Sequence, residues 1–158
     1  MRISHLIFAG LAACTVTTAA HAETIHSFGT DIIRQFDKNQ DEDGLVNLFY
    51  QASVGRRSAL ILGAAQGDER RIYDIAWKRY NDKYLNGSFF QFGATYWDGR
   101  EESIESKFGG EARVGYEWPI ATWATLSGSV SATYGPEHPS TGDQDVIFLP
   151  HLSIMANF

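Results

Sequence analysis

The chain has 158 residues, which is enough for one domain. Apolar residues make up 44% of it and charged residues 20%, a balance that excludes both a disordered chain and a helical membrane protein. The net charge of −6, with no basic cluster interleaved with aromatic residues, argues against a nucleic-acid partner. Beyond the N-terminus no apolar run reaches the roughly 18 residues of a transmembrane helix, so a membrane segment would have to be a strand.

Residues 1–22 have the features of a secretory signal peptide. Arg2 precedes an apolar stretch, and Ala20-His21-Ala22 forms an A-x-A cleavage site before Glu23. A competing pattern ends at Cys14, because Leu11-Ala12-Ala13-Cys14 resembles a lipoprotein box that would leave this cysteine lipidated. Cleavage after Ala22 would leave one domain, residues 23–158, without cysteine, which suits an oxidising compartment and excludes thiol chemistry and cysteine-ligated metals.

Seven segments are predicted as strands, because six of them alternate between two kinds of side chain with the period of two that is typical of strands and one, residues 58–65, is a short run that is apolar on both faces. They span residues 45–56, 58–65, 72–80, 88–97, 111–118, 123–134 and 146–158. Short connections are predicted at 55–57 and 81–87, and a tight turn at Pro119 and Ile120. Longer polar connections are predicted at 37–44, 66–71, 98–110 and 135–145. The last strand has one wholly apolar face, which ends at Phe158.

A barrel with both chain ends on one side needs an even number of strands. Residues 24–36 are the only material for an eighth strand, although their apolar positions fit a helix face about as well. The sequence therefore predicts an all-β fold, an eight-stranded antiparallel meander barrel that crosses a membrane. The four polar connections hold 13 of the 19 acidic residues, which indicates that they face outward.

Aromatic residues are predicted at two levels, near the two ends of the strands, where membrane interfaces favour them. The level of the short connections comprises Trp77, Tyr80, Tyr84, Tyr116, Trp118, Trp123 and Phe158, and the level of the long ones Tyr73, Tyr96, Trp97 and Tyr134.

The runs WKRY, LNGSFFQFGATYW and GGEARVGYEWPI within residues 77–120, together with the last strand, resemble small eight-stranded outer-membrane barrels of the OmpA/OmpW superfamily type. The resemblance is one of pattern over residues 45–158 and includes no catalytic motif. It implies a Gram-negative outer-membrane location, with outer-membrane lipids, lipopolysaccharide and the barrel assembly machinery as partners. It also implies that Phe158 is the membrane-insertion signal.

Five charged residues fall on the face that is expected to point into the barrel. They are Asp74, Lys78, Glu111, Arg113 and Glu117. The interior of an eight-stranded barrel is just wide enough for side chains to fill it, and buried charges must pair. We therefore predict a lumen ion-pair network that plugs the barrel, with a path for small solutes as the alternative.

The loop DKNQDEDG at residues 37–44 places side-chain oxygens at alternate positions, as calcium loops do. An EF-hand would need glycine in place of Glu42 and glutamate in place of Leu48, so the match fails twice. A solvated acidic loop is the first interpretation. Weak binding of divalent cations alongside lipopolysaccharide is the alternative.

His138 and Ser140 follow Glu137 in the last outer loop, where a lipid A hydrolase could place its histidine, serine and acid. His151 and Ser153 repeat this spacing on the inward face of the last strand. The spacing in sequence does not show that the histidine and the serine of either pair lie within hydrogen-bond distance. The first interpretation is therefore a non-enzymatic barrel with a structural or surface-contact role and with no catalytic residue, metal or cofactor. Solute passage and lipid A hydrolysis remain alternatives.

Overall fold

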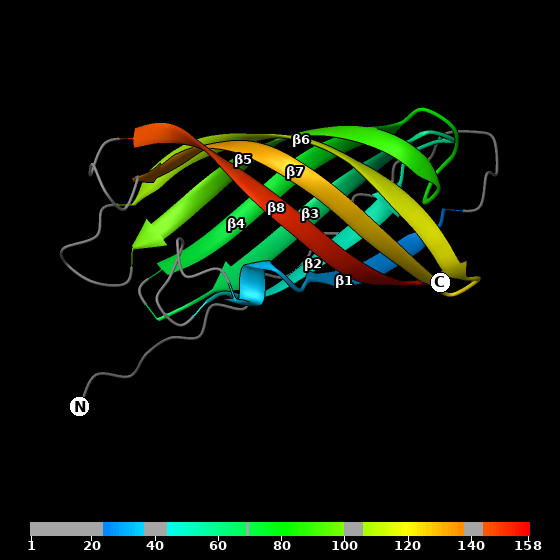
Figure 1. The fold of residues 1–158 in the computed structure, drawn as a ribbon, viewed down its shortest axis with the longest axis horizontal. Coiled ribbons are helices and arrows are strands. Elements are labelled where there is room, and N and C mark those ends of the chain that lie inside the picture. Colours follow the sequence, from blue (N-terminus) through cyan, green and yellow to red (C-terminus); the bar gives the residue numbers. More distant parts are fainter. Residues whose placement is uncertain (1–23, 37–43, 69, 100–105, 138–143) are drawn as a thin grey trace.

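The computed structural model describes residues 24–36, 44–68, 70–99, 106–137 and 144–158. Its strands form one closed antiparallel barrel, in which each strand pairs with its neighbours in sequence and the last pairs with the first (Figure 1). The predicted eight-stranded meander is confirmed. The strands are β1 (His26–Asp31), β2 (Val46–Ser53), β3 (Ser58–Gln66), β4 (Arg70–Tyr80), β5 (Gly87–Gly99), β6 (Lys107–Ala121), β7 (Ala124–Glu137) and β8 (Gln144–Asn157).

The barrel has two different ends. At the loop end lie the connections β1–β2, β3–β4, β5–β6 and β7–β8, and at the turn end lie β2–β3, β4–β5 and β6–β7 together with the start of β1 and the end of β8. The two predicted sets of connections therefore fall at opposite ends. Within the described ranges, no helix is long and apolar enough to cross a membrane.

Side chains alternate between the interior and the outer surface along every strand, as the pleat requires. The interior positions include many buried polar and charged groups, among them Gln51, Lys78, Gln91, Glu117 and His151. The outward positions are mostly apolar and exposed on all eight strands, with Phe28, Leu48, Leu62, Ile75, Phe92, Val114, Val130 and Ile154 as examples. The interior of the barrel thus holds many polar groups, whereas its outer surface is largely apolar.

Two apolar clusters lie inside the barrel near its ends. Leu45, Ala65, Ile72 and Trp97 pack together at the loop end, and Ala59, Tyr80, Phe89 and Tyr84 pack together at the turn end. Trp97, Tyr80 and Tyr84 lie near the predicted ends of the strands, but they pack inside the barrel and not on its outer surface, where interfacial aromatic residues were expected. The Trp97 Nε1 donates to Thr95 Oγ1 at 2.9 Å, and the Tyr80 hydroxyl donates to Glu117, as described below.

The segment predicted as the first strand is a strand only from His26 to Asp31, and the 3-10 turn η1 (Arg34–Phe36) follows it. Asp31 ends the strand because its Oδ1 accepts from the amides of Ile33 and Arg34, at 3.1 and 3.3 Å, as a helix-capping carboxylate does. Toward β2, the side-chain amide of Asn47 takes the place of backbone hydrogen bonds between the two strands. Its Oδ1 accepts from Asp31 N at 2.7 Å, and its Nδ2 donates to Asp31 O at 2.9 Å.

The predicted turn at Pro119 is wrong, because β6 continues to Ala121 with an irregular register between these two residues. Pro119 lies beyond Glu117, which pairs with Gly87 at the start of β5. By the alternation of the ladder its missing N–H would face β5, where no strand lies opposite. Pro150 of β8 is placed similarly. It lies two residues before Leu152, whose carbonyl accepts from Ile32 N at 2.7 Å, and β1 has already ended at Asp31. Both prolines therefore sit where the barrel needs no donor.

Candidate functional site

Lys78 and Glu117 form a fully buried ion pair in the turn-end half of the interior, with Nζ and Oε1 2.7 Å apart. Each has further partners. Lys78 Nζ also donates to Gln51 Oε1 at 2.9 Å and lies 4.3 Å from the centre of the Phe89 ring. The Tyr80 hydroxyl donates to Glu117 Oε2 at 2.8 Å and accepts from Gln51 Nε2 at 2.9 Å. This cluster satisfies its buried charges through four strands, β2, β4, β5 and β6.

Tyr84, in the turn between β4 and β5, covers this cluster from the turn end. Its ring lies 5.5 Å from that of Tyr80 in an edge-on arrangement, and its hydroxyl is 3.4 Å from Ser27 Oγ. Burial raises the pKa of the Tyr84 phenol, so that the group stays neutral over a wider pH range than an exposed tyrosine.

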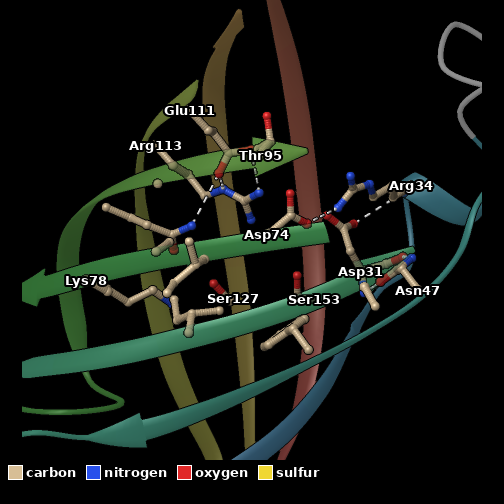
Figure 2. A pocket seen from close by; sticks show the side chains of 18 of the residues that line it. Asp31, Arg34, Asn47, Asp74, Lys78, Thr95, Glu111, Arg113, Ser127 and Ser153 are labelled. Atoms are coloured by element: carbon tan, nitrogen blue, oxygen red, sulfur yellow. Dashed lines mark hydrogen bonds and ion pairs between the residues drawn. The ribbon is translucent and has the colours of Figure 1, made fainter. Parts of the chain in front are cut away.

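The remaining predicted charges lie closer to the loop end, around a small cavity (Figure 2). Arg113 binds Glu111 in a two-pronged pair, with Nε to Oε1 at 2.9 Å and Nη2 to Oε2 at 3.0 Å. Asp74 pairs with Arg34 of the 3-10 turn at 3.1 Å. The cavity between them measures about 50 Å³, which is room for only a few water molecules.

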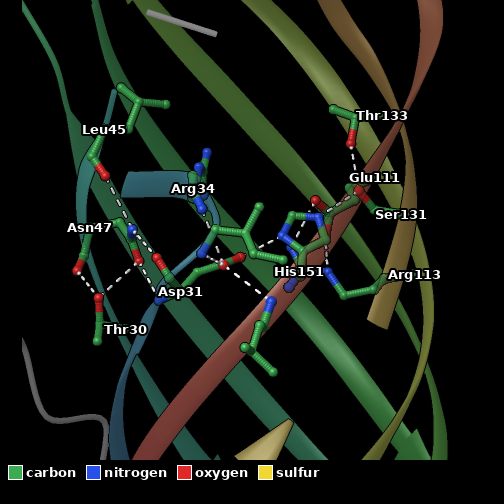
Figure 3. Close-up of polar contacts among 12 residues, drawn as sticks. Thr30, Asp31, Arg34, Leu45, Asn47, Glu111, Arg113, Ser131, Thr133 and His151 are labelled. Carbon is green, nitrogen blue, oxygen red and sulfur yellow. Dashed lines mark hydrogen bonds and ion pairs between the residues drawn. The ribbon is translucent and has the colours of Figure 1, made fainter. Parts of the chain in front are cut away.

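Asp31, His151 and Ser131 form a hydrogen-bonded chain across the barrel closure (Figure 3). Asp31 Oδ2 lies 2.5 Å from His151 Nδ1, and His151 Nε2 lies 2.8 Å from Ser131 Oγ. Because a carboxylate only accepts, Nδ1 carries a proton and donates it to Asp31. Ser131 Oγ is also 3.1 Å from Thr133 Oγ1, its neighbour on the same face of β7.

This order of groups is that of a serine hydrolase, in which an acid orients a histidine that takes the serine proton. Catalysis also needs a substrate carbonyl beside the serine oxygen. Ser131 is 1% exposed, His151 5% and Asp31 4%, and neither Ser131 nor His151 lines the cavity. The hydrogen bonds of Asp31, His151 and Ser131 instead join β1, β8 and β7. We call these three residues the clasp, because they hold together the strands at which the barrel closes.

Asp31, Arg34 and Ser131 were not among the predicted site residues. Arg34 and Asp31 were hidden because the segment 24–36 has no clear periodicity. His151 was predicted on the inward face of the last strand together with Ser153, and it lies there, buried. Ser153 lies on that face, but the histidine contacts Ser131 instead.

Several predicted residues lie elsewhere. The acidic loop residues 37–43, and His138 with Ser140, fall outside the described residues, as do residues 1–23. Phe158 is two-thirds exposed and exchanges two backbone hydrogen bonds with His26, at 3.0 and 2.9 Å. In the part of the chain that the structure describes, no three His, Cys, Asp or Glu side chains lie together in a way that could hold a metal ion.

Comparison with known proteins does not assign the chain to a group. No family model matches it, and neither a curated protein nor a solved structure is significantly similar to it. The class that the fold itself defines is the eight-stranded closed antiparallel β-barrel.

Proposed function

We propose that this chain is an outer-membrane β-barrel that crosses the bilayer with its eight strands and has a structural or surface-contact role. The observation that carries the proposal is the exposed apolar surface that surrounds the barrel, to which every strand contributes. In water such a surface costs roughly 25 cal/mol for each Å². A lipid environment removes this cost, and a closed barrel leaves no unpaired strand edge in the hydrocarbon.

A structural role is favoured over passage of solutes by the filled interior. The described ion pairs, the apolar clusters near both ends and a cavity of about 50 Å³ leave little space for a solute. In this proposal Asp74, Lys78, Glu111, Arg113 and Glu117 serve as a plug. The acid-rich connections at the loop end would face the cell exterior, where divalent cations could link them to lipopolysaccharide.

A signal peptide over residues 1–22, and recognition of Phe158 by the assembly machinery, belong to the same proposal. Both stay predictions. They account for how such a barrel would reach the outer membrane and insert there.

Lipid A hydrolysis stays the alternative. His138 and Ser140 lie outside the described residues, and the enclosed Ser131 offers no room for an acyl carbonyl. Mass spectrometry of lipid A from cells with and without the protein separates the two functions. Unchanged acyl chains fit the structural role, whereas an acyl change that is lost in both His138→Ala and Ser140→Ala would establish the enzyme.

Heat modifiability tests the membrane barrel directly. We express the whole chain in a Gram-negative host, separate the membranes and compare boiled with unboiled samples in detergent gels. The proposal expects the protein in the outer-membrane fraction, with the unboiled band migrating faster and with strand-rich circular dichroism. Recovery of a folded protein from the soluble periplasm without detergent would overturn it.

A further inference from the structure

An apolar hollow of about 590 Å³ lies against β1, β2 and β3 on the outer surface of the barrel. Its floor is formed by Ala64, whose small outward side chain lies opposite Leu48, and by the backbone of Gly63, where an added side chain would point inward to Asp74. Leu48 and Leu62 point outward and are exposed. The volume lies within the roughly 300–1,000 Å³ that is typical of small-molecule sites.

An aromatic wall borders this hollow toward the turn end. The Phe28 ring lies 5.3 Å from Tyr50 and 5.8 Å from Phe158, and the His26 ring stacks on both Tyr50 and Phe158. His26 Nδ1 and the Tyr50 hydroxyl satisfy each other at 2.5 Å. The wall therefore presents ring faces and edges to the hollow while its polar atoms are paired.

Two arginines lie at the tip of the β2–β3 hairpin, where the two strands that line most of the hollow reach the turn end of the barrel. Arg56 and Arg57 are exposed, and their carbonyls accept from Tyr84 N at 3.1 Å and Tyr80 N at 2.8 Å, which fixes the turn against its neighbour. Among the described residues, no acid contacts either guanidinium. The three turns at this end contain three cations, including Lys83, against one acid, Asp82.

We propose that the hollow binds an acyl chain of an anionic phospholipid whose phosphate contacts Arg56 and Arg57. The inference rests on the proposed function, because it requires the outer face of the barrel to lie in lipid. Guanidinium groups bind phosphate by paired, charge-assisted hydrogen bonds, and the apolar floor accepts the chain. Arg56 and Arg57 lie in the β2–β3 connection, so the lipid is assigned to the leaflet at the turn end.

Native mass spectrometry of the full chain folded in detergent tests this site. The probes are phosphatidylglycerol and phosphatidylcholine with identical acyl chains, and free phosphate as a headgroup control. We expect one phosphatidylglycerol per barrel to be retained in preference to phosphatidylcholine, and no retention of free phosphate. Replacing both arginines, R56Q with R57Q, should lower phosphatidylglycerol retention by at least about fivefold, whereas Arg71→Gln at the loop end should not.

Ala64→Phe tests the hollow itself, because the added ring would fill the floor. Ala94→Phe is its matched control, since Ala94 is also an exposed, outward alanine but lies on β5. We expect Ala64→Phe alone to abolish retention. Equal retention of the two lipids, an unaffected Ala64→Phe, or a second copy of the chain occupying the hollow would overturn the inference. All variants are first checked for heat-modifiable migration, so that failure of the barrel to fold in detergent is recorded separately as failure of the proposed function.

Discussion

Asp31 uses both of its carboxylate oxygens to hold the first strand of the barrel in place. Oδ1 caps the turn after β1 and accepts a longer bond from Leu152 N at 3.4 Å, and Oδ2 binds His151 of β8. The carboxylate is thus bonded on both sides of the joint between the first and last strands. An acid that is so enclosed is stabilising only while its partners remain.

Replacing Asp31 by asparagine should therefore destabilise the barrel strongly. The variant keeps the shape of the side chain but replaces one carboxylate oxygen by an NH2 group, which cannot accept from His151 or from the capped amides. A buried donor that loses its acceptor in this way costs about 1–3 kcal/mol. The urea midpoint for loss of the fast-migrating band measures the change. Asp68→Asn, at an exposed position in the β3–β4 connection, should leave the midpoint where it is.

The enclosure of Ser131 makes a second prediction at this scale. A fluorophosphonate probe, which labels activated serines, should not label the folded protein above the level of a Ser131→Ala variant, because the probe cannot reach an oxygen that is bonded to both His151 and Thr133. Specific labelling of Ser131, detected by peptide mass spectrometry, would show that the clasp is instead an accessible nucleophile.

At the scale of the strands, Gly29 allows β1 to pack closely against β2 and β8, where the barrel closes. Gly29 faces the interior on β1, and a Cβ added there would lie 2.4 Å from the Phe49 ring and 2.7 Å from Met155 Cγ. Both neighbours are held by their own strands. The short first strand thus approaches its two partners closely only because this position has no side chain.

Gly29→Ala should consequently destabilise the barrel by about 1–3 kcal/mol, the usual cost of overpacking a filled interior. Gly110→Ala is the matched control, since its added Cβ meets only Gly93 O at an ordinary 3.6 Å. Urea midpoints of the two variants, compared with the unchanged protein, decide the prediction. It fails if both variants unfold at the same urea concentration.

Strand alternation allowed the number and order of β2 to β8 to be predicted, because most of these strands have two faces in different surroundings. Their ends were predicted less well, since β6 (Lys107–Ala121) extends beyond the predicted segment 111–118 on both sides. The length of β1 could not be predicted, since it depends on side-chain bonds from Asn47, sixteen positions away, to the backbone of Asp31. Pro119 misled for a related reason. A proline in a sequence usually marks a turn. Only the structure shows that β5 begins at Gly87, opposite Glu117, so that Pro119 has no residue of β5 opposite it and its missing N–H is not needed there. The inward side of Trp97 was visible in its phase with Thr95, but interfacial preference was given more weight.

At the scale of the whole molecule, ion pairs between strand residues lie inside the barrel, and mostly apolar side chains cover its outer surface. The described ion pairs lie between the two apolar clusters in the interior, where the cavity measures about 50 Å³. The interior is thus filled largely by paired polar side chains and has little empty space. It favours a rigid body over a channel.

Planar bilayers provide the measurement for that property. We expect the purified protein to show no steady conductance steps, because an ion would have to displace paired charges and cross both apolar clusters. A porin inserted under the same conditions supplies the positive control. Stable single-channel steps from the protein would contradict the closed interior and favour the solute-passage alternative.

The short pairing of β1 with β8 has a consequence for the order in which the chain folds. Seven of the eight strand interfaces join neighbours in sequence and can form as local hairpins, whereas Ser27 and Asn157 meet across 130 positions. Loop-closure entropy and contact order make such a long-range contact slow to form. The sheet would therefore exist as an open, curved ribbon before it becomes a barrel, and its closing contact would be made last and, on unfolding, released first.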